Sequence, residues 1–345
     1  MRSTFAPWLA LAFALPAFGR DCADTDTSCL RDGSRQHVVR DLDYWRPMLQ
    51  RPLSDRIRPA PAEVVDYLAL DNRLNGFPER PRSATPDAAF LADLRRAADG
   101  IPARVWDLVA PGLAGVLLVD RLGSTGFTSI VRDAQGRAVA ASIVLDAGLL
   151  AGLDGNGWAS WKENTPFRRD GLHRLSVQME PEASNEREAA IRYILLHELG
   201  HAAGILKGVH PGWEAGTLPT SLAPWPFLQV SWAADRKGHP HPRDGQGFAQ
   251  RADVVYYVGA KLDIAEAAPT YRALARTSFP TLYAATNPWD DFAESFANYV
   301  HVVLLRKPWR VQLRGVGDDT ETFDACWGLP RCEAKERMLR ALLGP

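Results

Sequence analysis

The residues best suited to chemistry lie in the stretch YILLHELGHAAG, residues 193–204. His197 and His201 are four residues apart, so on an α-helix their imidazoles point to the same side. Two imidazoles with this spacing can bind one Zn²⁺ ion, and Glu198 can reach a water molecule on that ion. Zinc makes such a water acidic, and Glu198 could take its proton and later deliver it to a leaving amine. The pattern predicts a hydrolytic zinc site; the competing interpretation is a helix whose histidines are merely capped or solvated.

A third ligand has to come from elsewhere in the chain, because two histidines leave such a site one protein ligand short. Position 207, where a third histidine would complete one known type of zinc site, holds Lys207, and His210 comes three residues later. The stretch TLYAATNPWDDFAESFANY, residues 281–299, offers Asp290 and Glu294, again four residues apart. One of these carboxylates can bind the metal while the other accepts a hydrogen bond from a metal-binding histidine. Without a metal, the same acids would simply stabilise the start of a helix.

The two stretches together resemble a family of zinc peptidases. HELGH followed by Y-x-x-T-N-x-x-D-x-F-A-E-x-F is similar to the catalytic domain of anthrax lethal factor and the bacterial Pro-Pro endopeptidases, which are gluzincin-like enzymes with a mostly helical fold. Over about residues 185–305, the resemblance implies that Asp290 is the third zinc ligand and that Glu294 orients a histidine. It also implies that Tyr283 donates a hydrogen bond to the tetrahedral intermediate.

The chain departs from this family at the third ligand. The family has glutamate where this chain has Asp290, whose side chain is one methylene shorter. Either the helix that carries Asp290 approaches the histidines more closely, or Glu294 is the ligand. Asp291 is a poor third choice, because it lies on a different side of the helix.

Apolar spacing predicts the elements that must position these residues. Residues 184–206 form a helix, which Ser184 or Asn185 can cap and Gly204 can end. A second helix begins at Pro288 with Asn287 as its cap. Further helices are predicted within residues 61–74, 85–98, 270–278 and 333–343, and strands at 116–119, 127–131 and 138–145.

We therefore expect an α+β protein with three segments. Residues 111–345 form a zincin-like metallopeptidase domain, mostly helical with a small sheet. Residues 20–110 form an N-terminal extension, irregular to about residue 60 and helical beyond it. Residues 1–19 form a signal peptide, because Arg2 precedes an apolar segment that is too short to span a membrane comfortably.

Charge and cysteine content narrow the classes of partner and compartment. The net charge is −1, which gives no indication of a nucleic-acid or anionic-membrane partner. The signal peptide predicts a secreted or periplasmic protein with no stable membrane insertion after cleavage. An even number of cysteines in an exported chain favours disulfides. Two local loops, Cys22 with Cys29 and Cys326 with Cys332, are the simplest pairing, and a cross-link between the two ends is the alternative.

The sequence favours an exported zinc-dependent metalloendopeptidase that acts on a protein or peptide substrate. One Zn²⁺ per chain is expected, held by His197, His201 and Asp290, with Glu198 as general base and Tyr283 assisting. Two alternatives stay open: a catalytically inactive zincin-fold binding protein, and a zinc hydrolase acting on a non-peptide or cell-wall substrate. The intact Glu198 argues against the first, since a purely structural zinc site needs no base beside an open coordination position.

Overall fold

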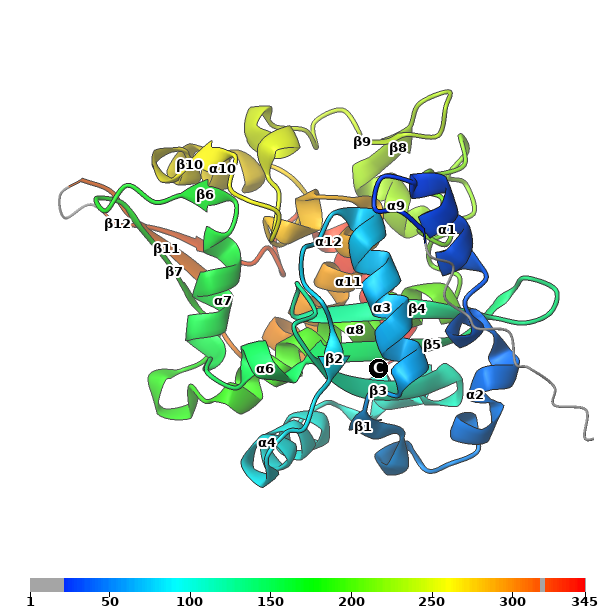
Figure 1. Ribbon diagram of the computed structural model, residues 1–345. Coiled ribbons are helices and arrows are strands. Elements are labelled where there is room, and N and C mark those ends of the chain that lie inside the picture. The colour runs from blue at the N-terminus through cyan, green and yellow to red at the C-terminus, as the bar shows by residue number, and fades with distance from the viewer. Residues whose placement is uncertain (1–21, 317–319, 345) are drawn as a thin grey trace, which may run out of the picture.

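The structure is a computed structural model that describes residues 22–316 and 320–344 (Figure 1). The helices are α1 (Thr27–Arg35), α2 (Leu42–Leu49), α3 (Ala62–Asn75), α4 (Ala88–Asp99), α5 (Ala103–Val109), α6 (Ala147–Leu150), α7 (Gly155–Asn164), α8 (Arg187–Leu206), α9 (Pro226–Ser231), α10 (Ala267–Leu274), α11 (Pro288–Tyr299) and α12 (Glu333–Leu343). The strands are β1 (Ile57–Pro59), β2 (Arg82–Ser83), β3 (Leu113–Asp120), β4 (Gly126–Arg132), β5 (Ala138–Asp146), β6 (Phe167–Arg168), β7 (Arg174–Gln178), β8 (Trp232–Ala234), β9 (Pro240–Pro242), β10 (Leu262–Asp263), β11 (Arg310–Arg314) and β12 (Thr320–Asp324). This mixture confirms the α+β class. The predicted signal peptide lies outside the described residues.

The central sheet contains the three strands that the sequence predicts. Its order is β1-β3-β5-β4, with β2 paired to β3. Strands β1, β3 and β5 run parallel, whereas β4 is antiparallel to β5. Within the described chain, the outer side of β4 meets other backbone at one isolated bridge, between Asp41 and Arg132. Residues 126–131 of β4 therefore form an edge of the sheet.

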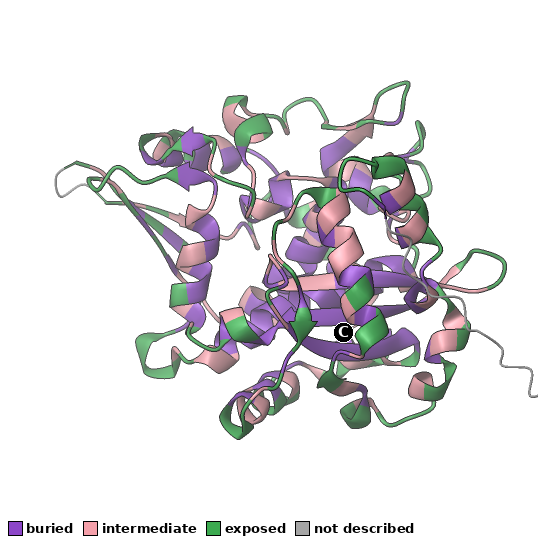
Figure 2. Cartoon of the chain, in the orientation of Figure 1, coloured by how far each residue is buried: buried purple, intermediate pink, exposed green. Residues whose placement is uncertain are grey.

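Helices cover both faces of this sheet. Helix α3 crosses the front face in Figure 1, and α8 lies behind it. The front core joins Tyr67 and Leu68 of α3 to Leu117 and Val144 of the strands. The rear core joins the strands to α4, α5, α8 and α11. Figure 2 shows the central strands and most of α8 as buried. Helix α8 is therefore surrounded by other elements of the fold.

The first part of the N-terminal extension, residues 20 to about 60, differs from the expected irregular arm. Helices α1 and α2 lie in the stretch that we expected to be irregular up to about residue 60, so that expectation is wrong. Helix α1 has little apolar pattern to detect, because it buries only Leu30 and Ser34, and the side chain of Asp26 caps it. Strands β1 and β2 also come from this segment and join the central sheet.

The disulfides follow the simpler predicted pairing. Cys22 is bonded to Cys29, and Cys326 to Cys332. The second bond lies directly before α12, whose bounds match the prediction. Within residues 22–316 and 320–344, every helix is too short or too polar to cross a membrane.

Helix α7 was not predicted and becomes important at the site. It lies between α8 and a three-stranded sheet of order β12-β11-β7. The side chain of Asp154 caps it by accepting a hydrogen bond from the backbone N–H of Gly157. Its buried side carries Trp158, Lys162 and Glu163.

Candidate metal centre

Helix α8 places His197 at a buried position and His201 at a partly buried one. It begins three residues later than predicted and ends at the predicted residue, and neither Ser184 nor Asn185 caps it. Asn185 instead accepts a hydrogen bond from the start of α7. Gly204 stands inside the helix rather than at its end. A side chain there would collide with His210 and Phe292, so close packing explains the glycine.

Helix α11 starts as predicted, and its N-cap restrains Asp290 in the first turn. The side-chain oxygen of Asn287 accepts hydrogen bonds from the backbone N–H groups of Trp289 and Asp290. The side-chain nitrogen of Asn287 also donates to Asp290 Oδ2. One residue therefore caps the helix and restrains its first acid, which leaves Asp290 Oδ1 to face α8.

Helices α8 and α11 approach each other closely at Gly200. If Gly200 carried a Cβ atom, that atom would lie 2.9 Å from both Cα and the carbonyl oxygen of Ala293. A glycine is therefore required here for the backbones to come so near. The helix that carries Asp290 thus approaches the histidines closely, which is the first of the two possibilities raised by the sequence.

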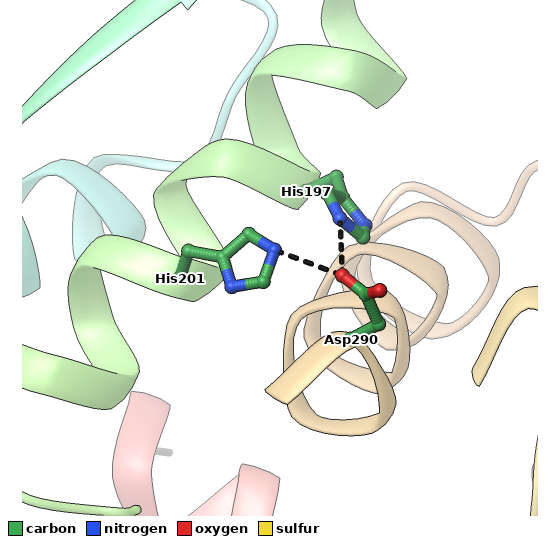
Figure 3. A group of neighbouring side chains, drawn as sticks. All are labelled: His197, His201 and Asp290. Atoms are coloured by element: carbon green, nitrogen blue, oxygen red, sulfur yellow. Dashed lines mark ion pairs between the residues drawn. The ribbon is translucent and has the colours of Figure 1, made fainter. Parts of the chain in front are cut away.

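His197, His201 and Asp290 converge, with one ligand atom from each lying within 4.8 Å of the others (Figure 3). Oδ1 of Asp290 is 3.2 Å from Nε2 of His201 and 3.7 Å from Nε2 of His197. Donors around a tetrahedral zinc with bonds of about 2.0–2.2 Å stand roughly 3.3–3.6 Å apart. The distances from Asp290 to both histidines and the donor types therefore fit a metal ion with two imidazole ligands and one carboxylate ligand.

Glu294 lies on the other side of the His197 ring. Its Oε2 atom is 2.9 Å from Nδ1 of His197, and its side chain is fully buried. The carboxylate therefore restrains the ring nitrogen that points away from Asp290. Asp291 faces elsewhere, because both of its oxygens accept hydrogen bonds from Lys335.

These contacts shift the ionisation of the site. Burial lowers the pKa of the His197 imidazole, but the Asp290 and Glu294 carboxylates outweigh burial and raise that pKa to about 9. Burial raises the pKa of the Glu294 carboxyl, but Lys162 and His197 lower it to about 2. The pKa of Asp290 is also held well below its usual value, because the two histidines outweigh burial. Both carboxylates are therefore ionised at neutral pH.

Glu198 points toward the sheet edge. Thr128 of β4 donates a hydrogen bond to Glu198 Oε2 at 2.6 Å. The other oxygen lies against Gly126, where any side chain would collide with it. Glu198 and His197 share the wall of a cavity of about 40 Å³. Edge strand β4 therefore both anchors the carboxylate and leaves room beside it.

Tyr283 also lines this small cavity. Its ring centroid is 5.5 Å from that of His197. The pKa of the Tyr283 hydroxyl is raised well above its usual value by burial and by the nearby Asp290 carboxylate. The phenol is therefore protonated at neutral pH and able to donate a hydrogen bond.

Tyr257 was not identified from the sequence, although it separates two cavities. Together with Ser124 it lines both the small cavity beside His197 and a neighbouring cavity of about 630 Å³. Its backbone has φ +68°, a conformation that is uncommon for residues other than glycine. The ring of Trp161 lies 5.7 Å from that of Tyr257 and lines the larger cavity.

The first residues of the loop that follows α8 lie next to the site. The ring of Trp213 is 5.4 Å from that of His201, and Pro211 accepts a hydrogen bond from Trp289 of α11. His239 and His241, by contrast, lie exposed in and beside the β8–β9 hairpin. They lie outside the metal-binding group formed by the described residues.

Comparison with known proteins gives no assignment for this arrangement of residues. No protein-family model, no curated protein and no solved structure matches the chain. What the protein does must therefore follow from the chemistry of the residues that α8, α11 and β4 bring together.

Proposed function

We propose that the protein is an exported zinc-dependent metalloendopeptidase with a zincin-like catalytic fold. The observation that carries this proposal is the convergence of His197, His201 and Asp290 beside a cavity that Glu198 also lines. Three protein ligands with an open position are typical of catalytic zinc sites, whereas structural sites use four. The resemblance of the two motifs to gluzincin-like peptidases supports the same function.

The residues divide the work of peptide hydrolysis among them. When bound, zinc would act as a Lewis acid and make a water molecule acidic enough to lose its proton near neutral pH. Oε1 of Glu198 would take that proton, because Oε2 is already engaged by Thr128. The protonated Glu198 would then deliver the proton to the leaving amine. Tyr283 would donate a hydrogen bond to the oxyanion as it forms.

The substrate would reach the site from the larger cavity. The cavity beside His197, about 40 Å³, holds no more than a water molecule or two. The adjoining cavity of about 630 Å³ is large enough for several side chains of a peptide. Edge strand β4 adds unpaired backbone groups, with which an extended peptide can form hydrogen bonds.

Export to an oxidising compartment is part of the proposal. Disulfides persist outside the cytosol, and both cysteine pairs are bonded. Together with the predicted signal peptide, they support a secreted or periplasmic location.

The proposal is tested by metal analysis followed by peptide cleavage. The mature protein should contain about one zinc per chain and should cleave members of a random peptide library. A chelator should stop cleavage, and Glu198→Gln should stop it while keeping the metal. Stoichiometric zinc without cleavage of any peptide would favour a binding protein or a hydrolase of another substrate. Absence of zinc binding would reject the site itself.

A further inference from the structure

Lys162 is a charged side chain in a part of the molecule where charge is costly. It lies on α7 and is 2% exposed. Burying an ammonium group is strongly unfavourable unless it is paired and hydrogen-bonded. The groups that compensate for its burial therefore indicate which part of the molecule it serves.

Four aromatic rings surround the Lys162 ammonium group. Its Nζ atom lies 4.3 Å from the ring centroid of Tyr283. The ring centroids of Trp158, Tyr193 and Trp309 are 5.6–5.9 Å away. A cation within about 6 Å of an aromatic ring is attracted to its face. The nearest of these rings belongs to a residue of the proposed active site.

The hydrogen-bond partner of Lys162 is the carboxylate that holds His197. Nζ of Lys162 donates to Oε1 of Glu294 at 3.0 Å. The hydroxyl groups of Tyr193 and Thr281 donate to the same oxygen, each at 3.1 Å. The other oxygen, Oε2, is left for Nδ1 of His197. Each oxygen thus has its own partners, and the carboxylate cannot turn without breaking several of these bonds.

A second carboxylate approaches Lys162 but is engaged elsewhere. Oε1 of Glu163 is 4.0 Å from Nζ, too far for a hydrogen bond. Oε2 of Glu163 accepts hydrogen bonds from the hydroxyls of Tyr256 and Tyr271. Glu294 is therefore the closer and better-oriented partner.

We propose that Lys162 is a positioning residue of the metal site, acting through Glu294 on His197 and through ring contact on Tyr283. The inference rests on the proposed function in one respect, which is that His197 binds a metal. Because Lys162 holds Glu294 in place, Oε2 of Glu294 accepts a hydrogen bond from Nδ1–H of His197. Nε2 of His197 then faces Asp290, where the ion would lie. Lys162 also keeps Glu294 from swinging toward the ion and competing with Asp290.

The chain offers a matched control for this proposal. Lys335 is also fully buried, and its Nζ atom pairs with both oxygens of Asp291 at 2.6 and 2.8 Å. Its ammonium group lies 4.9 Å and 5.3 Å from the rings of Phe279 and Phe227. Asp291 is on the same helix as Glu294, yet it contacts neither histidine in the described hydrogen-bond network. Removing Lys335 should therefore destabilise the fold without reaching the metal.

The experiment compares Lys162→Met with Lys335→Met in the full mature protein. Zinc affinity is measured by competition with a chromogenic chelator, and the visible absorption of the Co²⁺-substituted protein reports ligand geometry. Both variants should unfold at a lower temperature. Lys162→Met should bind zinc about 10- to 100-fold more weakly, as expected for loss of support behind a ligand, and should alter the Co²⁺ spectrum. Lys335→Met should change neither.

A double variant tests the route and guards against poor folding. In a Glu294→Gln background, adding Lys162→Met should not weaken zinc binding further, because the two residues act in series. Further weakening there would overturn the route through Glu294. Wild-type zinc affinity in folded Lys162→Met would overturn the inference while leaving the proposed function intact. Failure of the wild-type protein to bind zinc would overturn both.

Discussion

Helix α11 carries two buried carboxylates three residues apart that serve different regions of the molecule. Asp291 pairs with Lys335 of α12, and Glu294 pairs with Lys162 of α7. Each carboxylate also accepts hydrogen bonds from neutral groups: Asp291 from Trp232 and Ser295, Glu294 from Tyr193 and Thr281. The difference is that Glu294 has one additional partner, His197.

A buried pair of a lysine and a carboxylate thus occurs twice on α11, with two different roles. A buried ion pair costs desolvation and is weak evidence of stabilisation, although removing one partner is strongly destabilising. On the Asp291 side, the pair attaches the C-terminal helix to α11. On the Glu294 side, the carboxylate of the pair also contacts Nδ1 of His197, whose other ring nitrogen, Nε2, faces Asp290. The three acids of α11 can thus be separated by experiment into one ligand, one support for a ligand and one packing contact.

The largest expected difference in zinc binding is between variants of the neighbouring residues Asp290 and Asp291. Asp290→Ala should lose stoichiometric zinc, because Asp290 Oδ1 is the one carboxylate oxygen among the converging ligand atoms. Asp291→Asn should keep zinc but lose about 3–5 kcal/mol of unfolding free energy, since Lys335 would be left without a buried counter-charge. Metal analysis after dialysis and denaturant unfolding of the metal-free proteins measure the two effects. Zinc loss in a folded Asp291→Asn variant would erase the distinction between the two sides of α11.

The sequence predicted which side chains of this region share a helix side better than it predicted their surroundings. Spacing of four residues places His197 and His201 on one side of α8, and Asp290 and Glu294 on one side of α11, because helix geometry alone determines such relations. The bounds of α12 and the three central strands follow from equally local patterns. The local disulfides belong to the same class, since each closes a short loop.

Contacts between residues of different helices and strands could not be predicted from such local patterns. Thr128 meets Glu198 only because β4 lies beside α8, and Lys162 meets Glu294 only because α7 and α11 both pack against α8. The aspartate at position 290 remained ambiguous, because the sequence does not show how closely α8 and α11 approach each other at Gly200 and Ala293. Helix α1 was missed for a different reason, which is that Leu30 is its one buried apolar residue and the rest of the segment is polar.

The next largest effect is on turnover, and it distinguishes Glu198 from the acids that form the two ion pairs. Glu198→Gln should lower turnover by about 10²–10⁴-fold, because proton transfer by a positioned base is commonly worth that much. Zinc content and unfolding free energy should stay at wild-type values, unlike those of the Asp290 and Asp291 variants. Thr128→Val is the matched control, since it removes the hydrogen bond to Oε2 but keeps the carboxylate, and it should have a smaller effect. Full peptide cleavage by Glu198→Gln would reject its role as base.

Tyr283→Phe should act on the rate alone. The phenylalanine ring keeps the contact with Lys162 but loses the hydroxyl that would meet the oxyanion, so kcat should fall by about 10²–10³-fold. KM and zinc affinity should be unchanged, because the lost hydrogen bond forms mainly in the transition state. Steady-state kinetics on a cleaved peptide give the split. A rise in KM with unchanged kcat would place Tyr283 in substrate binding instead.

The smallest expected effect tests why this site uses an aspartate. Gly200→Ala would place a Cβ atom 2.9 Å from the Ala293 backbone, so α8 and α11 must separate slightly. Such overpacking costs about 1–3 kcal/mol of unfolding free energy, and it would move Asp290 away from the histidines and weaken zinc binding modestly. Asp290→Glu alone should also weaken binding, because the longer side chain is too crowded at the present distance.

The two changes together should bind zinc more tightly than Gly200→Ala alone, since the extra methylene spans the wider gap. This non-additivity is the signature of residues coupled through a shared backbone shift. Gly152→Ala, where a Cβ atom would meet open space, is the control and should leave zinc affinity unchanged. If the double variant binds zinc no better than Gly200→Ala, the close contact between the helices does not set the length of the ligand. The aspartate would then owe its reach to Asn287, which holds its other oxygen.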